Sequence, residues 1–486
     1  MSIGLVDAVA GSGKTTAIIN NAVNLAIEHK KRVCIALPTK EVIDEKFADA
    51  VALADGRIPV YSVHGDVGGS AKVGTKLDQV LKNIGSKKPA VLFTTHTTFN
   101  DCPNWIGTEH WKFYVDELFD PIEHKELRLP YHYGILTELL ELLSPSDTFS
   151  EVRIASGNGK TFKQRLDGSD DVDAVLLPIT KRLDQPKRWK VYVNTNNYRT
   201  VTSGIGSSRL VDQREKGAVL YFWAVQQPWF EREGLDVTLA SACFTDRLLY
   251  KLWQSNGTVF EPDTAVMNQL LAHAHDGQGL ELHCMNVHDW SKWLKNGRRL
   301  IPIKGQITPQ HKLEQLIRDT FGADPFIFNA NKDWKHTELG PNAKKISVVE
   351  HGKNAHSSYL NVAFMPSLLP VSEKWQFIRW LGFTEIDIRD EYYHSHAYQT
   401  VFRTAARQQN RTGTVRAIVP GRAACEYIRR KAPGAKIIVH EVLDPAGSRG
   451  RPRKYETPEQ ARAADAQRRR AKRQAAKLAA ASISSP

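Results

Sequence analysis

The sequence has few cysteines, and no two of them form a Cys-x-x-Cys pair. Five cysteines are scattered over 486 residues, whereas zinc ribbons and disulfide frameworks depend on closely spaced pairs. No run approaches the roughly 18 consecutive apolar residues that a membrane-spanning helix needs. A basic and then apolar N-terminal stretch, the mark of a secretory signal, is also missing. We therefore expect a protein of the reducing cytoplasm, neither secreted nor inserted in a membrane.

Acidic residues are in the minority. The 66 Lys and Arg residues outnumber the 53 Asp and Glu residues, giving a net charge of +13 and an isoelectric point near 9.3. Residues 442–486 hold 11 basic and four acidic residues, so a net +7 lies in this segment. The excess favours a polyanionic partner, and nucleic acid is the commonest one. A generically basic soluble protein is the alternative.

Short apolar segments alternate with amphipathic ones in two regions of the chain. In the first region, strands are expected at 3–8, 32–37, 58–63, 90–95, 112–115 and 235–241. In the second, strands are expected at 280–286, 326–329, 345–350, 361–365, 415–419 and 436–440. Alternation of strands with helices predicts parallel sheets that are covered by helices. The expected fold class is α/β.

Changes in composition suggest three domains. We expect one α/β domain at 1–250, a second at 251–441 and a basic tail at 442–486. Residues 121–235 are rich in Gly, Ser, Asp and Asn without clear periodicity, and we interpret them as an insertion into the first domain. The tail is rich in Arg, Ala, Gln and Lys and is expected to be disordered when free.

The clearest motif is a glycine-rich loop at residues 8–15, Ala-Val-Ala-Gly-Ser-Gly-Lys-Thr. It matches the phosphate-binding pattern G-x-x-x-x-G-K-[ST] except for Ala8 at the first glycine, and it lies between an apolar strand and an apolar-faced helix. Successive backbone N–H groups can point at phosphate oxygens, and the helix N-terminus adds partial positive charge. Lys14 is expected to reach the β- and γ-phosphates and the Thr15 hydroxyl to bind Mg²⁺. The predicted nucleotide-binding residues are Ala10, Gly11, Ser12, Gly13, Lys14, Thr15 and Thr16.

Two carboxylates end the apolar strand near residue 115. Asp116 and Glu117 follow Phe-Tyr-Val, and a parallel strand places its carboxyl end beside the phosphate loop. Asp116 is expected to hold Mg²⁺, directly or through water, and Glu117 to orient and deprotonate an attacking water. A small-molecule kinase must exclude water, whereas a motor ATPase needs a base for it. The second carboxylate therefore favours hydrolysis.

Further segments fall in the order of the motifs of superfamily 2 helicases, the DEAD/DEAH-like proteins. The phosphate loop and Val-Asp-Glu at 115–117 resemble motifs I and II of that family. The segments that resemble motifs Ia, Ib, III, V and VI are 38–40, 94–96, 238–244, 351–354 and 399–407. The resemblance spans roughly residues 3–420. This chain, with its compact set of motifs and basic C-terminus, resembles the helicases that phages and other mobile elements encode.

This resemblance implies two lobes of the RecA type with ATP and Mg²⁺ in the cleft between them. Carried over by position, Gln399, Arg403 and Arg407 belong to the second lobe, and the arginines are expected to touch the γ-phosphate. Loss of that contact when the lobes open couples hydrolysis to lobe motion and to stepping along a strand.

Two features depart from the family pattern. The second arginine of motif VI follows the glutamine by seven residues in the family, whereas Arg407 lies eight residues after Gln399. Either Arg403 or Arg407 alone could therefore be the arginine finger. Only two residues precede the first expected strand, so we expect the upstream adenine-reading segment of many DEAD-box proteins to be absent.

Several residues are candidates for nucleic-acid contacts. Thr39, Lys40 and Thr95 end the strands of motifs Ia and Ib, where hydroxyls and cations suit phosphate contacts and equally suit loop capping. The tail sequence Arg-Gly-Arg-Pro-Arg-Lys at 449–454 is similar to an AT-hook core, which lies in a narrow A·T minor groove. Its candidate contacts are Arg449, Arg451, Arg453 and Lys454. A tail that only solubilises or binds any polyanion is the alternative.

Basic and aromatic residues are interleaved at 187–193, Lys-Arg-Trp-Lys-Val-Tyr-Val. Such a segment can stack on single-stranded bases, but a half-buried strand with one solvated face is the favoured interpretation.

The sequence thus predicts an ATP-dependent nucleic-acid helicase or translocase acting on DNA, in replication or recombination. The alternative is an ATP-switched replication initiator or loader that binds DNA without separating its strands. Glu117 together with the arginines near Gln399 favours turnover, because a switch needs no base for water. The expected partner is DNA rather than RNA, with replication proteins as further candidates, and the cofactors are ATP and Mg²⁺.

Overall fold

The computed structural model describes residues 2–442 apart from 66–69, 85–87, 106, 129–132, 144–145, 147, 168–170, 204–218, 298–306, 335–338, 349–355 and 409. The described residues up to His440 form one compact unit. The tail arginines and the motif V segment at 351–354 therefore lie outside the described residues.

A parallel sheet of seven strands, counted among the described residues, forms the first lobe. Its strand order is β12-β1-β11-β5-β2-β4-β3, and each neighbouring pair runs parallel. The strands are β1 (Ile3–Ala8), β2 (Arg32–Leu37), β3 (Val60–Val63), β4 (Ala90–Thr95), β5 (Trp111–Asp116), β11 (Asp236–Ala242) and β12 (Phe260–Pro262). Since β12 pairs with β1, the first sheet extends beyond residue 250.

Helices cover both faces of this sheet because its inner strands bury apolar side chains on both sides. Along β2, Val33 and Ile35 pack into one core and Cys34 into the other, as the twofold alternation of a strand requires. The first core is closed by α1 (Lys14–Glu28), α2 (Lys40–Ala54) and α12 (Thr264–Met267). The second is closed by α3 (Ser70–Ile84), α4 (His96–Asn100) and α11 (Leu248–Ser255).

The insertion between β5 and β11 is an antiparallel sheet, with strand order β6-β10-β9-β8-β7 among the described residues. Its strands are β6 (Ile122–Leu127), β7 (Leu140–Leu143), β8 (Phe149–Ile154), β9 (Trp189–Asn194) and β10 (Leu220–Gln226). Helices α5 (Gly134–Thr137), α6 (Gly159–Gln164), α7 (Asp171–Leu183) and α8 (Thr195–Ser203) accompany them, and α10 (Trp229–Arg232) leads back to β11. One face packs on α6, α7 and α8. The sequence showed no periodicity here, so this sheet was not predicted.

The second lobe is again a parallel sheet, of strand order β15-β14-β16-β17-β13-β18 among the described residues. Its strands are β13 (Leu280–Met285), β14 (Phe326–Asn329), β15 (Ala343–Lys345), β16 (Asn361–Phe364), β17 (Val415–Ile418) and β18 (Lys436–His440). Its helices are α13 (Lys292–Lys295), α14 (Pro309–Phe321), α15 (Ser372–Trp380), α16 (Glu385–Arg389), α17 (Ser395–Val401) and α18 (Arg422–Lys431). Two parallel-sheet lobes of the RecA type therefore confirm the predicted fold class.

The expected strand at 345–350 is wrong in position. The structure has β15 at Ala343–Lys345, paired with β14, and Ile346 only adds one hydrogen bond to Phe328 at 2.8 Å. The apolar residues after 345 suggested the strand, but the four-residue β14 leaves no room for pairing further along.

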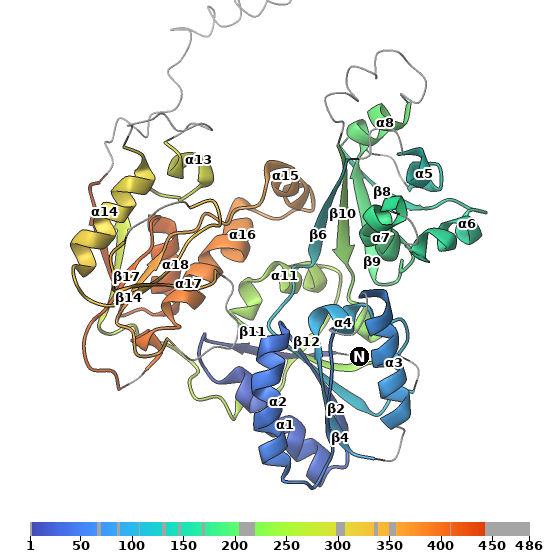
Figure 1. The fold of residues 1–486 in the computed structure, drawn as a ribbon, viewed down its shortest axis with the longest axis horizontal. Helices are drawn as coiled ribbons and strands as arrows, with labels where there is room; N and C mark the ends of the chain where they lie inside the picture. The colour runs from blue at the N-terminus through green and yellow to red at the C-terminus, as the bar shows by residue number, and fades with distance from the viewer. Residues whose placement is uncertain are drawn as a thin grey trace, which may run out of the picture. The chain divides into compact units, whose positions relative to one another are not determined.

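Helix α15 reaches from the second lobe to β6 and β10 of the insertion (Figure 1). Phe377 of this helix stacks on Trp223 of β10 at 5.0 Å between ring centroids. Trp380 contacts Tyr192 of β9 and Phe149 of β8 at 5.6 and 5.4 Å. The face of the insertion sheet that α6, α7 and α8 leave free is thus covered by an aromatic cluster shared with the second lobe.

The segment of interleaved basic and aromatic residues is strand β9 and its lead-in. Trp189 is buried and Tyr192 packs on Phe377 and Trp380, while Lys190 is exposed. This is a half-buried strand with a solvated face, the favoured interpretation. Its rings are not displayed as a stacking platform for bases.

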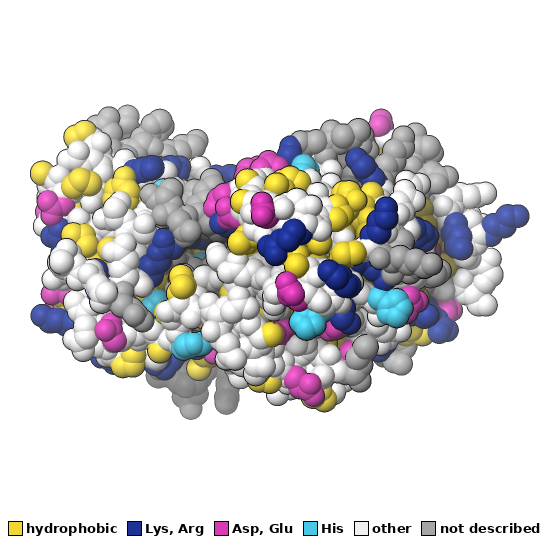
Figure 2. All heavy atoms as spheres, turned by 90° about the horizontal axis from the view of Figure 1, so that it is seen from below, with side chains coloured by type: hydrophobic (Ala, Val, Ile, Leu, Met, Phe, Trp, Pro, Cys, Tyr) yellow, Lys and Arg dark blue, Asp and Glu magenta, His cyan; other side chains and the backbone are white. Residues whose placement is uncertain are grey.

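All five cysteines are free and buried. In the described part of the chain, no helix is long and apolar enough to cross a bilayer. On the face seen in Figure 2, basic, acidic and apolar side chains are interspersed among the described residues.

The close approach of β1 to β11 gives a test of the first sheet. A Cβ on Gly4 would lie 2.2 Å from Thr238 Oγ1, whose hydroxyl donates to Asp263 at 2.8 Å. Because Thr238 is fixed, we expect Gly4→Ala to cost about 1–3 kcal/mol of unfolding free energy, as overpacked cores do. Gly159→Ala, where a Cβ meets nothing within 4 Å, is the matched control. Thermal melts should separate the two variants, and equal melting temperatures would contradict this strand packing.

Candidate active site

The glycine-rich loop leaves β1 and curls into the first turn of α1. Gly11 and Gly13 have φ angles of 74° and 80°, in the left-handed region that favours glycine. Gly13 is the N-cap of α1, so the N–H groups of the following residues open toward the loop. Ser12 and Lys14 are buried, and Ser12 Oγ meets no hydrogen-bond partner in the described structure. This is an anion cradle at a helix N-terminus.

Ala8 replaces the first glycine of the pattern at no conformational cost. The residue is still part of β1, pairs with Ala242 of β11, and its carbonyl accepts a bond from Cys243 N–H at 3.1 Å. It does not have a positive φ, so the backbone here does not require glycine.

Asp116 is the last residue of β5 and lies against the phosphate loop. The Thr15 hydroxyl donates to Asp116 Oδ2, while Oδ1 is buried without a hydrogen-bond partner. Burial, together with the neighbouring charge of Glu117, raises the pKa of Asp116 to about 6 despite the opposing effect of Lys14. A buried carboxylate oxygen without a hydrogen-bond partner is available to ligate a cation.

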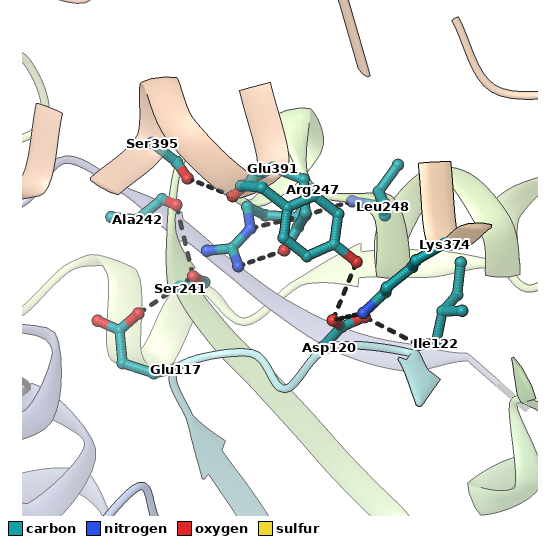
Figure 3. Close-up of polar contacts among 11 residues, drawn as sticks. Glu117, Asp120, Ile122, Ser241, Ala242, Arg247, Leu248, Lys374, Glu391 and Ser395 are labelled. Carbon is teal, nitrogen blue, oxygen red and sulfur yellow. Dashed lines mark hydrogen bonds and ion pairs between the residues drawn. The ribbon is translucent and has the colours of Figure 1, made fainter. Parts of the chain in front are cut away.

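Glu117 follows in a strained backbone conformation. Its φ is 66°, and its N–H bonds the Ala240 carbonyl at 2.8 Å, which turns the side chain out of the sheet. One carboxylate oxygen lies 3.8 Å from Lys14 Nζ. The other accepts a bond from the Ser241 hydroxyl at 3.3 Å, as Figure 3 shows. Glu117 thus points into the space in front of the phosphate loop.

The residues fit a hydrated magnesium ion. Mg²⁺ prefers oxygen ligands and is usually bound by one or two carboxylates together with substrate phosphates. Asp116 Oδ1 and the Thr15 hydroxyl supply such oxygens beside the phosphate cradle. The described residues hold no cluster of three or more His, Cys, Asp or Glu side chains that could hold a metal ion.

The second lobe and the linker before it contact the same loop. Arg407 lies on Gly11, where an added Cβ would be 2.8 Å from Arg407 Cδ. The Ala10 N–H donates to the Tyr398 hydroxyl at 3.2 Å, and the Ala10 carbonyl accepts from His275 at 2.9 Å. Burial lowers the pKa of His275 to about 4, so this histidine is neutral and donates through Nε2. Desolvation also lowers the pKa of Arg407.

The three motif VI candidates differ in position. Gln399 lies on α17 and Arg403 just after it, both half-buried, while Arg407 ends the short 3-10 turn Ala405–Arg407. Arg407 is the one whose contact with the phosphate loop is seen.

Sequence reasoning missed His275 and Tyr398 as neighbours of the loop. An isolated histidine and a single aromatic on a helix carry no motif. Nothing in the local sequence could have found either contact, because both join segments that are far apart in the chain.

The first-lobe candidates for nucleic-acid contact serve as helix caps. Thr39 accepts a bond from Val42 N–H at 3.4 Å at the start of α2, and Lys40 is the first residue of that helix. Thr95 accepts from Thr98 N–H at 3.2 Å at the start of α4. The two caps sit at the carboxyl ends of adjacent strands, β2 and β4. Capping explains these threonines, and a phosphate contact stays a prediction.

The geometry defines a P-loop nucleoside-triphosphatase site. Residues 4–118 match the family model of the DEAD/DEAH box helicase, a span that contains the phosphate loop and ends one residue after Glu117. No curated protein matches the chain. Residues 4–118 are therefore similar to the DEAD/DEAH box helicase family, and this part of the chain has the site of an ATP-hydrolysing enzyme of the helicase type.

Solved structures give more distant likenesses. Xpd4 of S. tokodaii is 12% identical with a TM-score of 0.42, over 90% of this chain and 96% of that one. S. cerevisiae Dbp5 bound to RNA and ADP BeF3 is 10% identical with a TM-score of 0.35, over 91% and 86%. The helicase MrfA bound to DNA and AMPPNP is 10% identical with a TM-score of 0.32, over 90% and 50%. The assignment rests on the family match and on the site.

The raised pKa of Asp116 gives a prediction with a definite sign. A carboxyl whose pKa is higher folded than unfolded binds protons more tightly in the folded state, so its charge destabilises the fold above about pH 6. We expect Asp116→Asn to raise the melting temperature at pH 8 and the gain to shrink as pH falls from 6 toward 4. The same variant should lose ATP hydrolysis. A lower melting temperature at pH 8 would contradict this electrostatic account.

Proposed function

We propose that the protein is an ATP-driven DNA helicase or translocase in which Mg²⁺–ATP binds between the phosphate loop and motif VI. The observation that carries the proposal is the convergence of Lys14, Asp116 and Glu117 from one lobe with Arg407 from the other at a single loop. A site built from residues of two lobes is complete only when the lobes are together. Hydrolysis can therefore be coupled to the motion of the lobes.

Each side chain has a part that its position supports. The phosphate loop, residues 10–16, cradles the phosphates, and Lys14 neutralises them. Thr15 and Asp116 hold the magnesium ion, which draws charge from the phosphate oxygens when bound. Glu117, oriented by Ser241 and close to Lys14, takes a proton from water.

Arg407 is the better candidate for the arginine that stabilises the transferring phosphoryl group. It reaches the loop at Gly11, whereas the spacing of the family pattern left Arg403 and Arg407 open. Gln399 lies on α17 and precedes both arginines in the chain, so we retain it as a motif VI residue.

The preference for DNA rests on the tail. Its AT-hook-like residues suit a narrow minor groove, and its net charge suits any phosphate backbone. Thr39, Lys40 and Thr95 are proposed to contact the backbone of the translocated strand. A role in replication or recombination follows from this choice of DNA.

Lys14→Ala is expected to abolish ATP hydrolysis while DNA binding survives through the tail. The change removes the cation that neutralises the phosphates and leaves residues 442–486 intact. Hydrolysis should be measured with single-stranded DNA, double-stranded DNA and RNA, with Lys436→Ala, an exposed lysine on β18, as the control. Equal activity in Lys14→Ala and wild type would exclude this site. Hydrolysis that no nucleic acid stimulates would instead favour the initiator or loader.

Arg407→Ala is expected to lower kcat by roughly 10³-fold with little change in KM for ATP, as for other arginine fingers. Arg403→Ala should lower it much less, because Arg407 is the residue that contacts the loop. Arg429→Ala, exposed on α18, serves as the control. Single-turnover hydrolysis gives the comparison. A larger loss in Arg403→Ala would reverse the assignment.

A further inference from the structure

A buried ion pair joins the two lobes behind the active site. Arg247 donates from Nε to Glu391 Oε2 at 3.0 Å and from Nη2 to Oε1 at 2.6 Å. Glu391 also accepts the Leu248 N–H at 2.7 Å and so caps α11, whose own N-cap residue makes no side-chain cap bond. Arg247 is 7% exposed and Glu391 3%. The residues are 144 positions apart in the sequence.

Glu391 belongs to a π-helical turn, Asp390–His394, that joins α16 to α17. The wider turn directs two successive side chains at the first lobe. Glu391 binds Arg247, in the segment that follows Ser241 and β11. The Tyr392 hydroxyl donates to Asp120, three residues after Glu117, at 2.9 Å. π-Turns within α-helices occur frequently at functional sites. Here the turn contacts the loops that follow motifs II and III, and it leads directly into the helix of motif VI.

Arg247 lies near a second carboxylate, that of Glu117. Ser241, in strand β11, donates a hydrogen bond to Glu117, and Figure 3 shows the Arg247 guanidinium between Glu391 and the Ser241–Glu117 contact. Burial is the largest single effect on Arg247 and lowers its pKa, but Glu391 and, to a lesser degree, Glu117 raise the pKa above its ordinary value. The hydrogen bonds to Glu391 use Nε and Nη2 of the guanidinium.

Other ion pairs between the lobes are more exposed. Lys251 with Asp387 and Lys431 with Asp246 have side chains about one fifth to one third exposed. Water takes over such charges when the lobes part, so these pairs contribute little. The Arg247–Glu391 pair is buried and bidentate, so separation of the lobes removes two charge-assisted hydrogen bonds from Arg247 at once. Arg247 is then left to water or to Glu117, the carboxylate near it on its own lobe.

We propose that Arg247 is exchanged between two carboxylates, held by Glu391 when the lobes are together and paired with Glu117 when they separate. Pairing with Arg247 occupies the carboxylate that would otherwise accept a proton from water, so hydrolysis stops in the open state. Arg247 and Glu391 are thus positioning residues that act through Glu117. The inference rests on the proposed role of Glu117 as the base.

The exchange predicts opposite results for the two halves of the pair. Glu391→Gln leaves the cation free to capture Glu117, and we expect kcat to fall at least tenfold with KM for ATP within twofold. Arg247→Met removes the cation and should keep kcat within about threefold of wild type. The double variant Arg247→Met/Glu391→Gln should match Arg247→Met and so recover the loss. If the pair only stabilised the fold, both single changes would instead lower kcat equally.

The stability of each variant is measured alongside, because removing one partner of a buried ion pair is strongly destabilising. Rates are compared well below the lowest melting temperature. If Glu391→Gln does not fold, Glu391→Asp keeps the charge but shortens its reach, and its reduced kcat should be restored by Arg247→Met. Lys251→Met and Asp387→Asn, the more exposed pair between the lobes, form the matched control and should change kcat less than twofold.

The outcomes separate this inference from the proposed function. Full hydrolysis in Glu117→Gln would refute the role of the base itself. Loss of hydrolysis in Glu117→Gln, with equal kcat losses in Arg247→Met and Glu391→Gln and no recovery in the double variant, would overturn the exchange alone.

Discussion

Two adjacent carboxylates share one lysine at the carboxyl end of a buried parallel sheet, and the rest of the site is arranged around that constraint. Asp116 ends β5 and Glu117 follows it, Lys14 comes after β1, and Ser241 lies near the end of β11, the strand between β1 and β5. Because parallel neighbours end on the same edge, the three strands bring these groups together without any long loop. Burial and, after it, the neighbouring charge of Glu117 raise the pKa of Asp116, and Lys14 offsets only part of this effect.

That imbalance explains why the site suits a substrate that brings its own metal. A bound nucleotide would add negative charge, and the magnesium ion that it carries would offset the charge of the Asp116 carboxylate. The backbone contributes as well. The left-handed φ of Glu117 separates the two side chains, so that Asp116 faces Thr15 while Glu117 faces the open side near Lys14. Residues in rare backbone conformations persist where the surroundings hold them, and here the bond to the Ala240 carbonyl does so.

The sequence predicted the parts of the fold whose signal is local. Strands such as β1, β2 and β4 are short apolar runs because both faces are buried, and the structure places them at the expected bounds. The phosphate loop and acidic pair also carry fixed spacings. The sequence did not predict the insertion sheet, because one face packs on α7 and the other on α15 of the second lobe. The burial of its side chains therefore follows no single pattern along the chain. Contacts such as Arg247 with Glu391 have no local signal at all.

The burial of the contacts between the lobes determines how abruptly lobe motion can switch hydrolysis on or off. A surface ion pair weakens gradually as its partners part, because water and salt screen it at every distance. A buried, bidentate pair is made or broken almost as a unit, since an intermediate geometry leaves both charges poorly solvated. Bistable contacts of this kind convert small displacements into discrete states. The burial of Arg247 and Glu391, directly behind Ser241, therefore places a two-state contact where the second lobe can act on Glu117.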